Sequence, residues 1–358
     1  MCGKQILTIK PGGKSRMFVR LAALVLLASA SMFADAISFA NNYNAIVFGN
    51  LSNTSGGDIE GRALIGGNAN LSNFSVGASL SQSGTRDDLI VGNNLTANGN
   101  WQVRGNAVYG GTLTGSVSHP GTSTTSHISN ITLDSSNGNV VRSGNPGTTI
   151  AGLEQSLMDE STALGQLATT VGAITNFDGY NLTLSSTGTG LIVFNVDLSL
   201  WNTGPNGPTY TRTISAPSGS TVLINLIGSA ATVNGGSMNL TGGIDTSHVL
   251  LNYYQATTFN ASNFEFNGSI LAPFTTTSTF SGGHVNGLGI FGGNATATNG
   301  WEWHNKGFSG NLGQPDTSSV PEPSTILLLG LGLVVTGLGF RKRLKAISAQ
   351  PKTSEVTA

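Results

Sequence analysis

The stretch that decides the fold is Leu64-Ile65-Gly66-Gly67-Asn68-Ala69-Asn70-Leu71. It joins a short apolar pair, a Gly-Asn corner and a second apolar pair. Variations on this phrase recur at residues 89–95 and 103–113. Each phrase predicts a short strand that turns sharply, with Gly or Asn supplying the positive φ that we expect at such corners.

A second series of apolar groups follows the middle of the chain, at residues 222–227, 249–254, 264–271 and 285–291. Their starts lie 27, 15 and 21 residues apart, loosely the length of one coil of a β-solenoid. The series predicts a mainly β fold, a right-handed β-solenoid whose coils bury their inward residues on one another. Short strands with polar turns also fit a jelly roll or a sandwich, and the irregular spacing leaves these alternatives open.

One segment, from about residue 152 to 172, has a helical pattern. Its stripe of Leu153, Leu157, Leu164, Leu167 and Val171 follows helical spacing, while Glu154, Asp159, Glu160 and Gln166 lie off the stripe. We expect one long α-helix that covers a flank of the solenoid, with Glu160 free to be replaced.

The end of the chain carries a tripartite signal. Val320, Pro321, Glu322 and Pro323 precede an uncharged apolar segment at residues 324–340, and Arg341, Lys342 and Arg343 open a basic tail that runs to residue 358. The apolar segment is long enough for a short membrane span, and the basic cluster would stop transfer on the cytoplasmic side. The three parts, preceded by a linker at 313–323, resemble the PEP-CTERM sorting signal, which implies processing by an exosortase. An ordinary single-pass anchor is the alternative.

The other end predicts a removed signal peptide over residues 1–36. A basic start is followed by an apolar run, and Ala34 and Ala36 form a small-x-small cleavage site. The mature chain is expected to begin near Ile37. Since the only cysteine, Cys2, falls in the removed part, no disulfide is expected.

Charge excludes one class of partner. Residues 37–320 hold six Lys and Arg against fourteen Asp and Glu, a net charge of −8. A body so poor in positive charge cannot neutralise a phosphate backbone, so nucleic acid is not an expected partner.

Several segments together resemble the bacterial choice-of-anchor A domain. They are residues 44–50 (NAIVFGN), residues 58–68 (DIEGRALIGGN), the central helix, residues 267–273 (NGSILAP) and residues 285–287. The resemblance covers residues 40–305, within a domain placed at 37–312, and implies surface attachment through an interchangeable tag. The layout also resembles, more distantly, the ice-binding β-solenoids. Neither resemblance implies an enzymatic activity.

The search for catalytic or metal-binding residues gives weak candidates. The five histidines show no zinc spacing. Asp58 and Glu60 would share one face of a strand, as glycosidase carboxylates or calcium ligands could, but Arg62 would share that face and could simply pair with them. Asp87 and Asp88 form the other close pair. No cofactor is expected, with calcium as the one alternative.

Aromatic residues give a further candidate. Trp301 and Trp303 would lie on one side of a short strand, either as a carbohydrate-stacking platform or, as we favour, as a cap on the last coil. Threonine runs such as residues 275–277 suggest ice binding, but a Thr-x-Thr on every coil is missing.

We therefore expect an exported, non-enzymatic protein of the Gram-negative cell surface or extracellular matrix, associated with exopolysaccharide or biofilm. It would be anchored transiently in the inner membrane until an exosortase processes it. The alternatives are a carbohydrate-active enzyme that uses Asp58, Glu60 or Asp87, and a polysaccharide-binding adhesin on the same scaffold.

Overall fold

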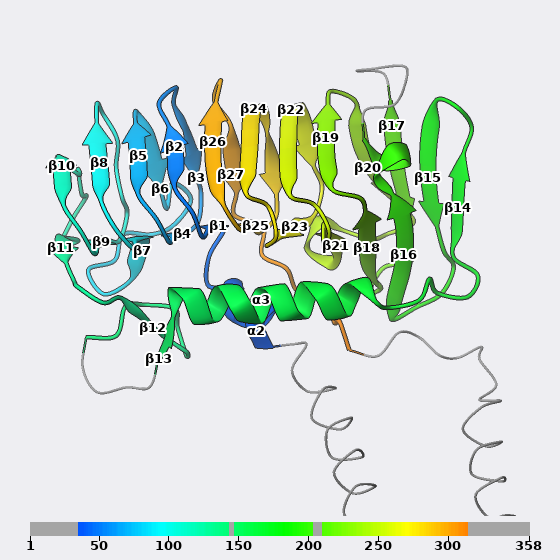
Figure 1. Ribbon diagram of the computed structural model, residues 1–358, viewed down its shortest axis with the longest axis horizontal. Coiled ribbons are helices and arrows are strands. Elements are labelled where there is room, and N and C mark those ends of the chain that lie inside the picture. The colour runs from blue at the N-terminus through cyan, green and yellow to red at the C-terminus, as the bar shows by residue number, and fades with distance from the viewer. Residues whose placement is uncertain (1–34, 143–146, 203–209, 314–358) are drawn as a thin grey trace, which may run out of the picture. The chain divides into compact units, whose positions relative to one another are not determined.

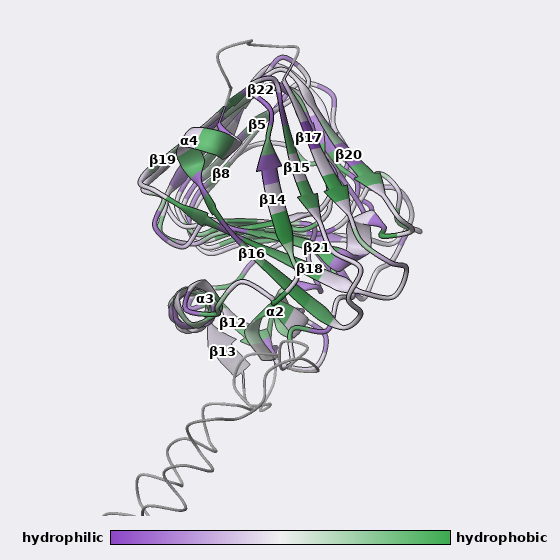
Figure 2. Cartoon of the chain, turned by 90° about the vertical axis from the view of Figure 1, so that its right-hand side faces the viewer, coloured by the Kyte–Doolittle hydropathy of each residue, from purple (hydrophilic) through white to green (hydrophobic). Residues whose placement is uncertain are grey.

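The computed structural model describes residues 35–142, 147–202 and 210–313, which form a β-solenoid with a helix along one side (Figure 1). The inter-coil strand pairs are parallel, which confirms the predicted mainly β solenoid and excludes the antiparallel jelly roll or sandwich. The cross-section is three-sided (Figure 2).

The first side is a ten-stranded parallel sheet. Its inner strands are apolar and buried on both faces, as their continuous apolar runs predict, whereas the edge strand β11 is polar and partly exposed. In spatial order it contains β11 (Thr125–His127), β9 (Asn106–Tyr109), β7 (Asp87–Val91), β4 (Ala63–Ile65), β1 (Ala45–Val47), β25 (Gly289–Phe291), β23 (Ser269–Ala272), β21 (Val249–Asn252), β18 (Thr221–Ile227) and β16 (Leu191–Asp197).

The second side carries eight strands in the order β10 (Leu113–Gly115), β8 (Leu95–Asn98), β5 (Ala69–Ser72), β2 (Leu51–Asn53), β26 (Asn294–Thr298), β24 (Thr277–Asn286), β22 (Thr258–Phe266) and β19 (Ala230–Asn234). β22 and β24 are long because each bends at a corner and continues onto the third side. Asn263 and Gly282 have positive φ at these bends, which only Gly and Asn adopt readily.

The third side consists of the ends of β22 and β24, of β27 (Glu302–His304), β3 (Gly57–Ile59) and β6 (Phe74–Val76), and of a four-stranded sheet. That sheet has the order β14 (Ile174–Phe177), β15 (Asn181–Ser185), β17 (Thr211–Ser215) and β20 (Ser237–Thr241). The remaining elements are α2 (Asp35–Ala40), α4 (Leu198–Trp201), the 3-10 turn η2 (Thr246–His248) and the hairpin of β12 (Thr132–Asp134) and β13 (Gly147–Thr149).

The coils are not stacked in sequence order. β1 lies between β4 and β25, so the first coil pairs with the last one in the middle of the stack. From there the chain builds outward to β11, returns along α3 (Ile150–Gly165), starts again at β16 and builds back to the middle (Figure 1). We call the β1/β25 contact the seam.

Coil length explains the irregular spacing in the sequence. Side chains that bond between neighbouring coils are 18 or 19 residues apart in the short coils. They are 26 to 30 residues apart where a coil carries an insertion. The strands therefore stay in register although the sequence period does not.

The helix packs on the outer face of the first sheet. Leu153, Leu157 and Leu164 join that sheet's outward apolar side chains in a buried cluster. Buried asparagines within the strands also hold the helix, since the Nδ2 of Asn225 donates to Leu164 O at 2.8 Å and that of Asn252 to Ser161 O at 2.9 Å. The predicted flanking helix is confirmed.

Two details of the helix prediction are wrong. The helix ends at Gly165, because the chain then follows the edge of β16, where Thr170 N donates to Val193 O; Val171 is exposed. Glu160, expected to be replaceable, is only 3 % exposed because α2 packs over it.

The expected role of the corner glycines is also corrected. Gly66, Gly92 and Gly110 do not have positive φ. Instead, a Cβ at each would overlap a backbone carbonyl oxygen of the preceding coil, namely that of Phe48, Gly66 and Gly92 respectively. Glycine is needed there because the coils stack backbone against backbone.

Gly92→Ala should therefore destabilise the fold by about 2–3 kcal/mol, because the overlapping atom is backbone and cannot rotate away. Gly307→Ala is the matched control, since its Cβ would meet only Asn41 Oδ1 at 3.9 Å. Urea unfolding of both variants measures the effect, and equal midpoints would contradict the stacking explanation.

Candidate functional site

The outer surface of the second side carries a repeating set of short, uncharged polar side chains. Alternate residues of each strand point inward and are buried, while the residues between them face outward. Because the pairs are parallel and in register, outward residues of successive coils line up in rows. We call this surface the polar face.

The central row crosses all eight strands. In spatial order it contains Thr232, Asn260, Thr279, Thr296, Ser52, Asn70, Thr96 and Thr114. A second row follows on one half, with Ala230, Thr258, Thr277 and Asn294, and a third with Asn234, Ser262, Ser281 and Thr298.

Hydrogen bonds between coils orient the polar face. Thr279 Oγ1 donates to Asn260 Oδ1 at 2.6 Å, and Ser262 Oγ donates to Asn234 Oδ1 at 2.8 Å. At the border with the first side, Asn68 N donates to Asn50 Oδ1 at 2.7 Å. The three rows contain no ionisable side chain, so the polar face can bind through hydrogen bonds but cannot perform acid-base chemistry.

Ionisable groups gather instead on the third side, beside the seam. Glu265 of β22 lies opposite His284 of β24, which lies opposite Glu302 of β27. His284 Nε2 is 3.3 Å from Glu265 Oε1, and the rings of His284 and His304 stack at 4.2 Å between centroids. We call these residues, with Asp58 and Glu60, the seam cluster.

The neighbours of the two sequence-predicted carboxylates differ from the expectation. Asp58 belongs to β3, next to Glu302, and its pKa is raised to about 6, first by burial and then by Glu302 and Glu60. Glu60 Oε2 accepts a hydrogen bond from Asn305 N at 2.8 Å. Asp58 is therefore held beside two other carboxylates, whose effect on its pKa His304 only partly opposes.

The sequence suggests that Arg62 pairs with Asp58 and Glu60, but in the structure it does not. The chain turns after Ile59, so Arg62 lies at the start of the first side and is buried there. Its Nε donates to Asp87 O at 2.8 Å, and its guanidinium lies 4.9 Å from the centre of the Tyr43 ring.

Asp87 and Asp88 hold ion pairs within the fold. Asp87 Oδ1 lies 2.6 Å from Arg142 Nη2, and Asp88 Oδ1 lies 2.5 Å from Arg86 Nε. Both carboxylates are fully buried, so neither reaches an external ligand in this structure.

Trp301 and Trp303 are fully buried and present no platform to a carbohydrate. They do not cap an end of the stack either, because the last coil lies at the seam and Trp303 is paired with Ile59 of β3. Their rings pack on Phe280, at 4.9 and 5.7 Å between centroids. Both expectations for the two indoles are therefore corrected.

Within the described ranges, no three His, Cys, Asp or Glu side chains are placed to hold a metal ion. Nor do these ranges contain a helix long and apolar enough to cross a membrane. The sorting motif at 320–323, the apolar segment at 324–340, Arg341, Lys342, Arg343 and Ala34 lie outside them.

Sequence reasoning missed the polar face and the seam cluster. The alternating pattern in segments such as 294–298 (NATAT) could have indicated outward Thr and Asn. The rows themselves require the register, and the seam cluster requires pairing between β27 and β3, whose residues are more than 240 apart in the chain.

The architecture defines the class: a parallel β-solenoid of ice-binding-like type with one long helix. Residues 36–305 match the family described as "Putative Ice-binding-like adhesive domain", and residues 319–343 match the PEP-CTERM protein-sorting motif. The chain belongs to this ice-binding-like adhesive family. The sorting motif implies export, cell-surface sorting and processing by an exosortase.

Solved structures with a similar course of the chain are ice-binding proteins. One from an Antarctic biological consortium has 16% identity and a TM-score of 0.33, covering 75% of this chain and 89% of its own. One from Shewanella frigidimarina has 13% identity and a TM-score of 0.30, covering 77% and 97%. One from the ascomycete Antarctomyces psychrotrophicus has 12% identity and a TM-score of 0.28, and the match covers 75% of this chain and 97% of that protein. Comparison with curated proteins gives no match.

The raised pKa of Asp58 predicts how stability depends on pH. Its folded pKa of about 6 exceeds the ordinary 3.8, so the ionised carboxylate destabilises the fold above pH 6, and stability from this group returns as the pH falls from about 6 to 4. Asp58→Asn should stabilise the protein at pH 7.5 by about 1 kcal/mol, less than the whole shift implies because the group is half exposed.

Urea unfolding at pH 5 and 7.5 measures this effect. Asp159→Asn, on the exposed side of α3, is the control for an equal change in net charge. A loss of stability in Asp58→Asn at pH 7.5 would contradict the prediction.

Proposed function

We propose that the chain is an exported, non-enzymatic adhesin of the cell surface or extracellular matrix that binds exopolysaccharide through its polar face. The central row of eight short polar side chains carries the proposal. Strand spacing of about 4.8 Å makes this row roughly 34 Å long, which suits an extended, hydroxyl-rich chain. A polar face without charge would bind neutral sugars in preference to ions.

In this proposal the tag controls delivery in a Gram-negative cell. The apolar segment at 324–340 holds the exported chain in the inner membrane, with Arg341, Lys342 and Arg343 on the cytoplasmic side. Exosortase then acts at Val320, Pro321, Glu322 and Pro323. An interchangeable tag of this kind also fits the choice-of-anchor A domain that the sequence resembles.

The polar face is tested by placing charge and bulk on its central row. Thr279→Lys with Thr296→Lys should weaken binding of the secreted chain to the producer's exopolysaccharide at least tenfold, because two adjacent coils lose their short side chains. Co-sedimentation with the polysaccharide measures it. Asn239→Lys with Thr241→Lys, two exposed positions of β20 on the third side, is the matched control. Equal binding by both double variants would refute the proposal.

Ice is the second candidate ligand, favoured by the same rows. Thr-x-Thr is present in β24, in β26 and at the start of β10, whereas β22, β19 and β8 each carry a single outward Thr and β5 carries none. Thermal hysteresis of the secreted chain, abolished in the Thr279→Lys and Thr296→Lys variant, would favour ice over polysaccharide.

The enzymatic alternative makes a separate prediction. If Asp58 and Glu60 catalyse no reaction, Asp58→Asn with Glu60→Gln should leave polysaccharide binding within a few-fold of wild type, with no release of reducing ends by either protein. A catalytic pair would instead give release that falls by about 10² to 10⁴ in the double variant. That result, measured by a reducing-end assay with and without calcium, would replace the adhesin by an enzyme.

A further inference from the structure

Glu160 is a carboxylate inside the contact between α3 and α2. Its side chain is 3 % exposed, and its Oε2 accepts a hydrogen bond from the backbone nitrogen of Ile37 at 3.1 Å. A buried carboxylate is costly unless a positive charge or several donors compensate it. The backbone N–H of Ile37 is one donor that meets this requirement.

Ile37 is the residue that follows the expected signal-peptide cleavage site at Ala36. Hydrolysis of the Ala36–Ile37 amide bond places the hydroxyl of water on the Ala36 carbonyl carbon and a proton on the Ile37 nitrogen. The freed amine takes up a further proton from solvent, because α-amino groups have ordinary pKa values near 8. The neutral N–H that faces Glu160 would then become an ammonium group.

We propose that the α-ammonium of Ile37, created by signal-peptide removal, forms an ion pair with buried Glu160 and fastens the mature N-terminus to α3. The geometry is already in place, since the nitrogen lies at hydrogen-bond distance from the carboxylate oxygen. Signal-peptide removal thus places a positive charge at hydrogen-bond distance from this carboxylate.

The rest of the first turn holds Ile37 in position. Its side chain is buried, and its carbonyl accepts a hydrogen bond from Asn41 N at 3.0 Å. The hydrogen bonds of Ile37 to Glu160 and to Asn41 both survive cleavage, because neither uses residues before Ile37.

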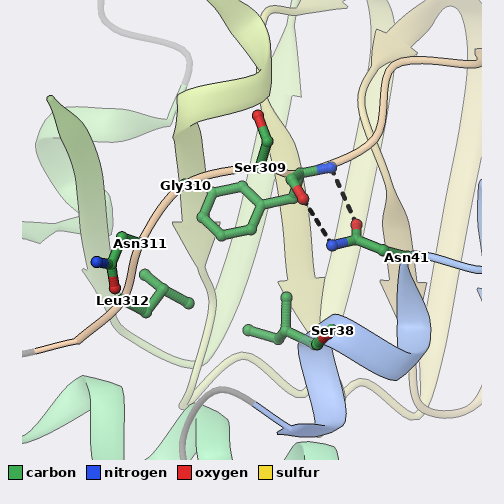
Figure 3. Close-up of a pocket in the computed structure, with 8 residues that line it drawn as sticks. Ser38, Asn41, Ser309, Gly310, Asn311 and Leu312 are labelled. Atoms are coloured by element: carbon green, nitrogen blue, oxygen red, sulfur yellow. Dashed lines mark hydrogen bonds between the residues drawn. The ribbon is translucent and has the colours of Figure 1, made fainter. Parts of the chain in front are cut away.

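Asn41 connects this first turn to the segment that leads to the sorting tag. Its Nδ2 donates to Phe308 O at 2.6 Å, and its Oδ1 accepts from Phe308 N at 3.0 Å (Figure 3). Ile37, Ser38 and Asn41 line a pocket together with residues 308–312. The ion pair would therefore stabilise the start and the end of the folded domain together.

The fold also sets the order of events. Ala36 is buried within α2, so a peptidase cannot reach the Ala36–Ile37 bond once α2 is packed. Cleavage must precede the packing of α2 on α3, and the new terminus completes that packing afterwards.

The experiment compares three N-termini on the chain from residue 37 to 358 in detergent: free Ile37, Nα-acetylated Ile37, and Ala36 retained as one extra residue. A cleavable fusion partner ending directly before residue 37 gives the free form. Acetylation and extension should each lower Tm by roughly 5 °C or more, because they remove or displace the charge opposite Glu160.

Glu160→Gln is the matched background, since an amide keeps the acceptor oxygen but not the charge. There the three N-termini should melt within about 2 °C of one another. If acetylation and extension lower Tm equally in wild type and in the Glu160→Gln variant, the proposed ion pair is overturned. Intact-mass analysis of exported protein gives an independent test, and a mature chain that begins at another residue would also overturn it.

Discussion

The seam is the constraint on which the rest of the structure depends. β1 must pair with β4 on one edge and with β25 on the other. The half-solenoid formed by the first part of the chain therefore has to meet the half formed by the last part in register. The contact is made by backbone and by Asn44, whose Nδ2 donates to Gly287 O at 2.9 Å and whose Oδ1 accepts from Gly61 N at 3.1 Å. One side chain thus ties coils from both halves.

The functional surfaces follow from this closure. The central row of the polar face reaches eight strands only because Ser52 of one half lies beside Thr296 of the other. The seam cluster exists for the same reason, since it brings Asp58 and Glu60 from the first half beside Glu302 and His304 from the second. A solenoid stacked in sequence order would also give long rows, but it would not bring the first coil next to the last one.

The sequence predicts those features that depend on local pattern, and misses those that depend on register. Leu153, Leu157 and Leu164 predict the helix because its stripe lies within sixteen residues. The sequence misplaces Trp303 because nothing in it shows that the last coil lies inside the stack. It misplaces Arg62 because the turn after Ile59 moves this residue to another side. The sequence predicts a turn conformation for Gly92, although the need for glycine there comes from a coil 26 residues earlier. A local sequence pattern cannot show contacts between residues that lie so far apart in the chain.

The seam also separates attachment from recognition. Because the first and last coils meet in the middle, the described chain starts at α2 and ends at Leu312 and Gly313 within the same region, next to the outer face of the first sheet. The polar face lies on another side of the three-sided stack (Figure 2). A domain held through the segment that follows Gly313 therefore keeps the whole central row away from its point of attachment. Within the described residues, this separation follows from the pairing of the first coil with the last.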